Sequence, residues 1–129
     1  MTIYNWLKSK QRYRKVYLFL RGLRHCWQYC IRGFSDRQLW SLDITIAKFI
    51  LPRLKRFKEI NENLPFDYEK NQSFTEAEWL AALDDMIFAM DIVASEEILI
   101  LSGAEDKAKL ERYQKGIHLF STHFTSLWL

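Results

Sequence analysis

Apolar residues recur every three or four positions along most of this chain, a spacing typical of amphipathic helices. The first such line predicts a helix over residues 3–31, and Gly33 is well placed to end it. Its apolar members are Tyr13, Val16, Tyr17, Leu20, Leu23, Trp27 and Ile31. No segment shows the two-residue alternation of a convincing strand.

A second helix is predicted over residues 36–60, with Pro52 inside it. Proline lacks the N–H that the helix needs, so we expect a kink near residues 48–51. The apolar stripe of this helix consists of Leu39, Ile46, Ile50, Leu54 and Phe57. Asp43 interrupts that stripe, and a buried carboxylate without a partner is strongly unfavourable. We therefore expect Asp43 to be paired, to bind a ligand, or to be turned to the edge of the stripe.

Two more helices are predicted, over residues 76–100 and 104–127, after a polar loop at residues 61–73. The third helix is expected to bury Trp79, Leu83, Met86, Met90 and Val93. The apolar positions of the fourth are Leu110, Tyr113, Ile117, Phe120, Phe124 and Leu127.

Three capping boxes mark helix starts. They pair Ser35 with Gln38, Thr75 with Glu78, and Ser102 with Glu105. Phe34 and Leu39 flank the first as a hydrophobic staple would, and Phe74 and Trp79 flank the second. Four helices with mostly short connections predict an all-α fold, a single domain over residues 1–129 resembling a four-helix bundle with a kinked second helix.

The composition of the chain indicates in which cellular compartment we expect the protein. The chain is 49% hydrophobic and 27% charged, as in globular proteins. It contains no apolar run long enough to span a bilayer, and its start lacks the apolar segment of a secretory signal. Two cysteines, Cys26 and Cys30, do not make a disulfide framework. We expect a protein of a reducing cytoplasm with two buried structural cysteines.

Charge is distributed unevenly along the chain. Residues 1–60 carry a balance of +11 and residues 61–129 a balance of −8, and no acidic residue precedes Asp36. Either the two halves pack with their charges together, or the basic half faces an anionic partner.

Residues suited to metal or acid–base chemistry are sparse. His25, Cys26 and Cys30 share one region, but the other histidines, His118 and His123, lie far away in the sequence. Glu59 and Glu62 form a single weak E-x-x-E pair without the second acidic motif of an all-α nucleotide pyrophosphatase. We therefore expect no metal, no cofactor and no enzymatic activity. A magnesium-dependent nucleotide hydrolase stays the least favoured hypothesis.

Arginines and aromatic rings alternate in the first helix and suit phosphates or stacked bases. Most of those rings also occupy its apolar line, so burial in a core is the competing interpretation. Nucleic-acid binding is compatible with the charge, although no helix-turn-helix pattern is present. A helix lying on a membrane is disfavoured because the core is expected to need the rings.

Arg24 and Arg32 are the cations expected to reach Asp43. One interpretation is a structural ion pair that fixes the first two helices against each other. The other is a polar pocket with Asp43 and an arginine at its floor and Trp40 at its rim.

The chain resembles a family of small, uncharacterised tailed-bacteriophage proteins. The resemblance rests on residues 32–58, RGFSDRQLWSLDITIAKFILPRLKRFK, then on residues 78–90, EWLAALDDMIFAM, and residues 116–128, GIHLFSTHFTSLW. It covers about three quarters of the chain in the same order, with an Arg-Gly-aromatic-Ser turn and a Trp-x-x-Asp helix as its most specific part. Phe34 stands where the family usually has Trp or Tyr, and Ile44 and Thr45 stand where aromatics often follow.

The resemblance implies a non-enzymatic phage accessory protein that counters a host function in the bacterial cytoplasm. Our leading hypothesis is that it binds an anionic ligand such as a nucleotide immune signal, through Arg24, Arg32, Arg37, Trp40 and Asp43. The alternative is an inhibitor of a host protein that handles nucleic acid, with Asp84, Asp85 and Asp91 on the acidic third helix as its contact surface. A homodimer is compatible with the high aromatic content.

Overall fold

The computed structural model describes residues 3–101 and 106–129, with side chains from residue 10 onward apart from Arg12. The chain is mostly helical, which confirms the all-α class. It divides into two compact units, residues 1–42 and residues 43–129. Each unit is described below by itself.

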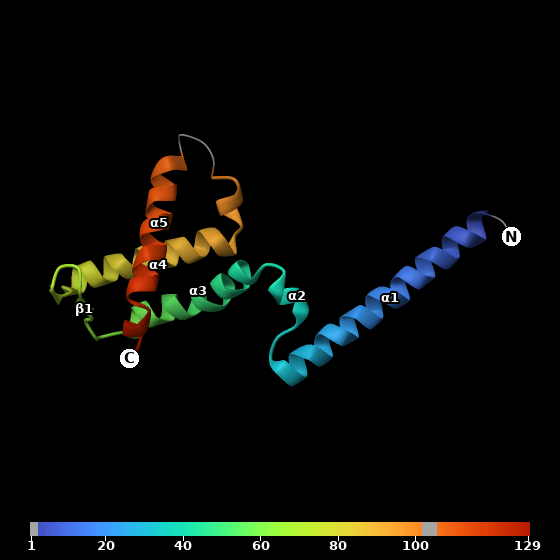
Figure 1. Cartoon of the computed structure of the whole chain (residues 1–129), viewed down its shortest axis with the longest axis horizontal. Coiled ribbons are helices and arrows are strands. Elements are labelled where there is room, and N and C mark those ends of the chain that lie inside the picture. Colours follow the sequence, from blue (N-terminus) through green and yellow to red (C-terminus); the bar gives the residue numbers. More distant parts are fainter. Residues whose placement is uncertain (1–2, 102–105) are drawn as a thin grey trace. The chain divides into compact units, whose positions relative to one another are not determined.

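The first unit consists of α1 (Ile3–Arg32) and the single-turn helix α2 (Asp36–Leu39) (Figure 1). The predicted end of α1 at Gly33 is confirmed. The Gly33 N–H donates to the carbonyl of Tyr29 at 2.9 Å, and Gly33 adopts a positive φ of 74°. Glycine occupies this left-handed position without the steric cost of a side chain.

Gln28 connects the two helices of this unit. Its buried side chain donates to Asp36 Oδ2 at 2.6 Å and accepts from the Asp36 backbone N–H at 3.0 Å. The predicted capping box is present at the same place, where the Ser35 backbone N–H donates to Gln38 Oε1 at 2.9 Å. These bonds satisfy backbone groups that a helix start leaves unpaired.

The prediction of one continuous helix over residues 36–60 is wrong. The chain turns at Trp40 and Ser41, and α3 (Leu42–Ile60) begins there. Ser41 and Asp43 are residue types that favour helix N-termini, so a new start at this point competes with continuation of α2. Pro52 lies inside α3, and Arg53 donates a side-chain hydrogen bond to the carbonyl of Phe49 at 2.7 Å beside it.

A short β-hairpin follows α3, whereas the sequence predicted a loop without strands. Strands β1 (Phe66–Asp67) and β2 (Gln72–Ser73) are antiparallel, with Phe66 opposite Ser73. The buried Asp67 carboxylate accepts the N–H groups of Glu69 and Lys70 at 3.0 and 3.2 Å, which builds the turn. Strands of two residues are too short to show a sequence alternation.

Helix α4 (Glu76–Ala94) starts as the second capping box predicts. The Glu78 N–H donates to Thr75 Oγ1 at 3.3 Å, and the Thr75 N–H donates to Glu78 Oε2 at 3.0 Å. The staple residues Phe74 and Trp79 are both buried, with ring centroids 5.4 Å apart. The third predicted box, at Ser102, lies outside the described residues.

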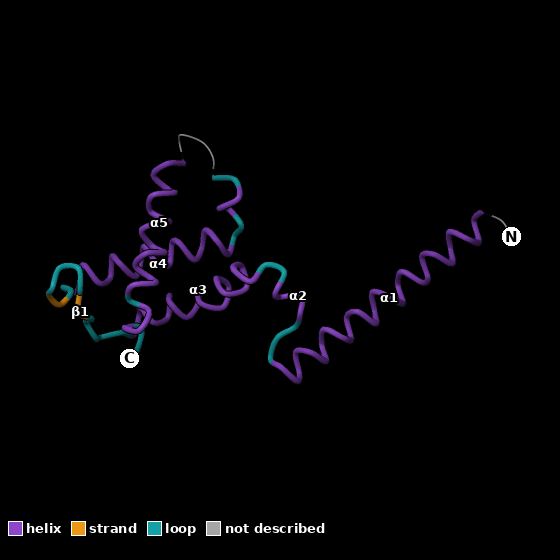
Figure 2. The backbone as a smooth tube through the Cα atoms, in the orientation of Figure 1, coloured by secondary structure: helices purple, strands orange, loops and turns teal. Residues whose placement is uncertain are grey.

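The last two predicted helices are longer than the observed ones. After α4, Glu96 takes a left-handed conformation and a separate 3-10 turn, η1 (Glu97–Leu99), follows. Helix α5 (Lys107–Thr122) is followed by a second 3-10 turn, η3 (Phe124–Ser126). Figure 2 shows α5 crossing α4, the pair of elements with the most extensive contact in the described chain.

The hydrophobic core belongs to the second unit and is built around α4. Leu83 and Met86 are fully buried, and Ala47 and Leu54 join them from α3. The predicted core residues of α4 are confirmed: Trp79, Leu83, Met86, Met90 and Val93 are all buried. Gly116 of α5 is buried against Asp85 and Ala89, where the two helices cross.

The predicted apolar line of α1 is not core. Its side chains are exposed from Tyr13 to Ile31, because the first unit has only the four-residue α2 to set against a helix of 30 residues. For the same reason Cys26 and Cys30, predicted to be buried, are exposed free thiols.

Candidate functional site

A hollow of about 540 Å³ opens at the corner between α1 and α2. Its lining residues are Arg21, His25, Asp36, Arg37, Trp40 and Ser41, which all belong to the first unit. Arg37 and Trp40 were both predicted as ligand-binding residues, and the fold brings them to this one place.

Arg24 and Arg32 lie at the same corner but bind Asp36 rather than Asp43. Arg32 Nη2 is 2.7 Å from Asp36 Oδ1, and Arg24 Nη2 is 3.6 Å from Asp36 Oδ2. The hydrogen bonds from Arg32 and then from Gln28 lower the pKa of the Asp36 carboxyl below its ordinary value. These two arginines therefore hold the helix corner, and Asp36 occupies the place in the ion pair that we expected for Asp43.

Asp43 is exposed in the first turn of α3 and does not line the hollow. It forms no ion pair with any other side chain that the structure describes. Of the three expected positions, the one at the edge of the stripe agrees with this exposure, because the chain turns before Leu42. That turn moves Asp43 from the middle of an apolar stripe to a helix N-terminus, where the helix dipole favours a negative charge.

His25 and Trp40 give the hollow its remaining chemistry. Both ring nitrogens of His25 are shielded from solvent and have no hydrogen-bond partner in the described part of the chain. Trp40 is 93% exposed. Trp40 therefore presents an exposed indole ring at the hollow, whereas the polar atoms of His25 are shielded.

Sequence reasoning did not select Arg21 and His25 for this site. They are four residues apart on α1, so both project from one side of the helix, and Arg37 reaches that side from α2. The spacing was visible in the sequence, but the position of α2 over this side of α1 was not. Neither Arg21 nor Arg37 makes an ion pair with another described residue.

The acidic surface predicted on α4 is largely engaged within the chain. Lys58 is 2.6 Å from Asp84, and both Arg112 and Lys115 bind Asp85, at 2.9 and 2.8 Å. Burial raises the pKa of Asp85, but the hydrogen bonds from Lys115 and Arg112 outweigh it and lower that pKa overall. Of the three predicted partner-binding carboxylates, Asp91 alone is exposed without an ion pair to a described residue.

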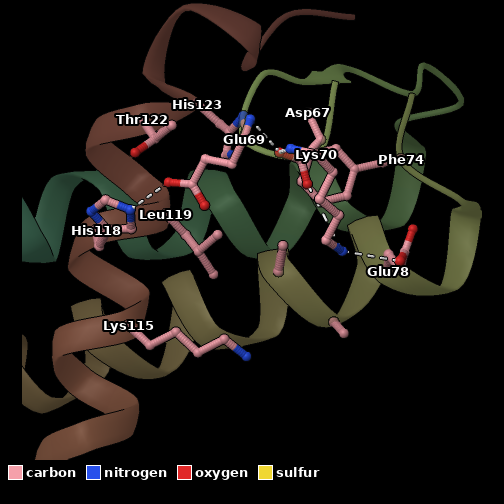
Figure 3. Close-up of a pocket in the computed structure, with 12 residues that line it drawn as sticks. Asp67, Glu69, Lys70, Phe74, Glu78, Lys115, His118, Leu119, Thr122 and His123 are labelled. Carbon is pink, nitrogen blue, oxygen red and sulfur yellow. Dashed lines mark hydrogen bonds and ion pairs between the residues drawn. The ribbon is translucent and has the colours of Figure 1, made fainter. Parts of the chain in front are cut away.

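A second hollow, of about 310 Å³, lies between the β-hairpin, α4 and α5 (Figure 3). Its charged groups pair with one another: His118 Nε2 is 3.0 Å from Glu69, and Lys70 Nζ is 3.1 Å from Glu78. His123 is buried there, with its ring edge-on to Phe74 at 5.1 Å. These pairs hold the hairpin against the two helices and leave few free charges for a ligand.

Three further observations bear on function. Within the described residues, no three His, Cys, Asp or Glu side chains are grouped closely enough to hold a metal ion. No helix in the described ranges is long and apolar enough to cross a membrane. Comparisons with protein-family models, with curated proteins and with solved structures found no match.

Proposed function

We propose that the chain binds a small anionic ligand carrying a planar ring, of the nucleotide class, in the hollow between α1 and α2. The observation that carries this proposal is the lining itself. Arg21 and Arg37, which have no carboxylate partner among the described residues, line one space of about 540 Å³ together with His25 and the exposed Trp40.

The charge of the first unit favours an anion. Residues 1–42 contain nine Lys or Arg and a single acidic residue, Asp36. That carboxylate already binds Arg24 and Arg32, so it does not neutralise Arg21 or Arg37 as well. A guanidinium presents a planar set of N–H donors that matches phosphate oxygens in two parallel hydrogen bonds.

Trp40 favours a ring beside that anion. Stacking of a base on an aromatic side chain contributes about 1–3 kcal/mol and accepts any base, because every base has a π face. The ring nitrogens of His25 are shielded from solvent, so the His25 side chain would have to rotate before they pair with donors or acceptors of the ligand. A nucleotide combines all three chemical features in one molecule.

The resemblance to small phage proteins supports a biological setting for this binding. We propose a non-enzymatic accessory protein that sequesters a nucleotide immune signal in the cytoplasm of an infected bacterium. We also retain a kink of α3 at Pro52 as a proposal.

The test is a binding titration with a panel of linear and cyclic nucleotides, followed by native mass spectrometry of the purified protein. Arg37→Ala and Trp40→Ala should each weaken binding about tenfold or more, since each removes a charged hydrogen bond or a stacked ring. Arg14→Ala, on the same helix outside the hollow, and Trp128→Ala, in the second unit, are the matched controls. Absence of binding across the panel, or equal losses in the controls, would contradict the proposal.

A further inference from the structure

A continuous apolar stripe on α1 has no partner within the first unit. It comprises Val16, Leu20, Leu23, Trp27 and Ile31, whose side chains are between 51% and 65% exposed. Steps of three and four residues place all five on one side of a helix with 3.6 residues per turn. Exposed apolar stripes of this length mark interaction surfaces.

The charged residues around the stripe all have one sign. No acidic residue occurs before Asp36, and Lys10 and Arg24 lie along one edge of the stripe, with Arg24 also 3.6 Å from Asp36. Long basic side chains at the edge of an apolar stripe lay their methylene groups on an apolar phase and extend their charges to anions at its surface. The occupant of this surface must therefore be apolar inside and anionic at its boundary.

We propose that α1 docks lengthwise on an anionic lipid bilayer, with this stripe among the acyl chains and the basic edge among the headgroups. The combination of aliphatic residues, Trp27 and one-signed basic flanks is that of helices that lie in a membrane interface. The described rings of α1 are not covered by any element of the first unit.

Other occupants fit the surface less well. A second copy of the chain would bring two first units together, each with nine basic residues and one acidic residue, and their like charges repel. The phosphates of a nucleic acid would pair with the basic side chains, but the aliphatic side chains of the stripe would stay in water. The stripe lies on another side of α1 than Arg21 and His25, so docking leaves the proposed ligand hollow open.

The experiment is co-sedimentation of the full chain with vesicles of equal parts phosphatidylglycerol and phosphatidylcholine, and with phosphatidylcholine vesicles alone. We expect binding to the anionic vesicles only, with a blue shift of tryptophan emission that Trp27→Phe reduces. Leu20→Glu and Leu23→Glu should each lower the partition coefficient about tenfold or more, because a charge enters the acyl region. Leu99→Glu, at a 78% exposed leucine of the second unit, should leave it unchanged.

A second pair of variants avoids changing the apolar stripe. Lys10→Gln and Arg24→Gln, both at the basic edge, should each weaken binding to anionic vesicles and reduce its dependence on salt. Failure to sediment with anionic vesicles at low salt overturns the proposal, and so does binding that Leu20→Glu leaves intact. A dimer in light scattering that Leu20→Glu dissociates, without vesicle binding, assigns the stripe to a contact between copies instead.

Discussion

At the residue scale, Asp36 and Asp43 show that the partners of a carboxylate depend on its exact position in the chain. Both stand near the start of a helix, and both are within reach of the arginines by sequence distance. Only Asp36 also binds Gln28, whose side chain holds it beside Arg24 and Arg32. We expected Arg24 or Arg32 to reach Asp43, and both bind Asp36 instead.

Replacing Asp36 should therefore open the corner between α1 and α2. In Asp36→Asn the charge that holds Arg24 and Arg32 is lost, and we expect faster amide hydrogen exchange at residues 35–38. Asp43→Asn is the control, because Asp43 is exposed and unpaired among the described residues. Equal exchange in the two variants would show that Asp36 does not hold the corner.

Glu78 makes the stability of α4 depend on pH. The hydrogen bond from the Thr75 backbone, followed by those from Lys70 and the Thr75 hydroxyl, lowers the pKa of Glu78 from 4.5 to about 2. A carboxyl whose pKa is lower in the folded than in the unfolded chain stabilises the fold at pH values above its unfolded pKa. This stabilisation is lost as the pH falls toward its pKa in the folded chain. Urea unfolding should show Glu78→Gln losing less stability than the natural chain between pH 4.5 and about 2. Parallel curves for the two proteins in this range would refute the assignment.

Gly116 controls how closely α4 and α5 approach. A Cβ at this position would overlap the backbone carbonyl of Asp85 and lie 2.7 Å from the Ala89 methyl group. Alanine normally stabilises a helix relative to glycine by about 1 kcal/mol, but here it must push two helices apart. We expect Gly116→Ala to lower the free energy of unfolding by about 1–3 kcal/mol in denaturant titrations.

Gly22 is the matched control for that substitution. It also lies inside a helix, and an added Cβ would meet no heavy atom within 4 Å. Gly22→Ala should leave stability unchanged or raise it slightly. A loss of similar size in both variants would mean that the α4–α5 crossing is not responsible.

At the scale of elements, helix starts were predicted better than helix lengths. The boxes at Ser35 and Thr75 are present because each involves residues only three positions apart. Interruptions after Leu39 and Ala94 were missed, since the apolar period continues through both. Where a periodic segment contains a second set of capping residues, such as Ser41 and Asp43, tertiary packing decides whether the helix continues.

At the scale of the whole molecule, the two units differ in the interactions that stabilise each of them internally. No apolar side chain described in residues 1–42 is buried, and the unit is held by the polar bonds of Gln28, Ser35 and Asp36. The second unit contains the entire described core. We infer that the second unit carries the cooperative stability of the chain.

A chain beginning at Asp43 should therefore keep a cooperative thermal transition. The peptide of residues 1–42 should be only partly helical by circular dichroism, since an isolated helix is marginal in water. Loss of cooperative unfolding in the shortened chain would show that the first unit contributes to the core.

The sequence by itself determined the helical class, two helix starts, the buried face of α4 and the basic character of the first unit. Each of these follows from residues within about four positions of one another, or from charge alone. Tertiary structure decided that Asp36 rather than Asp43 binds the arginines, that Gly116 lies at a helix crossing, and that the stripe of α1 is exposed. An apolar stripe in the sequence indicates that the helix needs a partner. Whether the side chains of the stripe are buried depends on which surface the fold places against them.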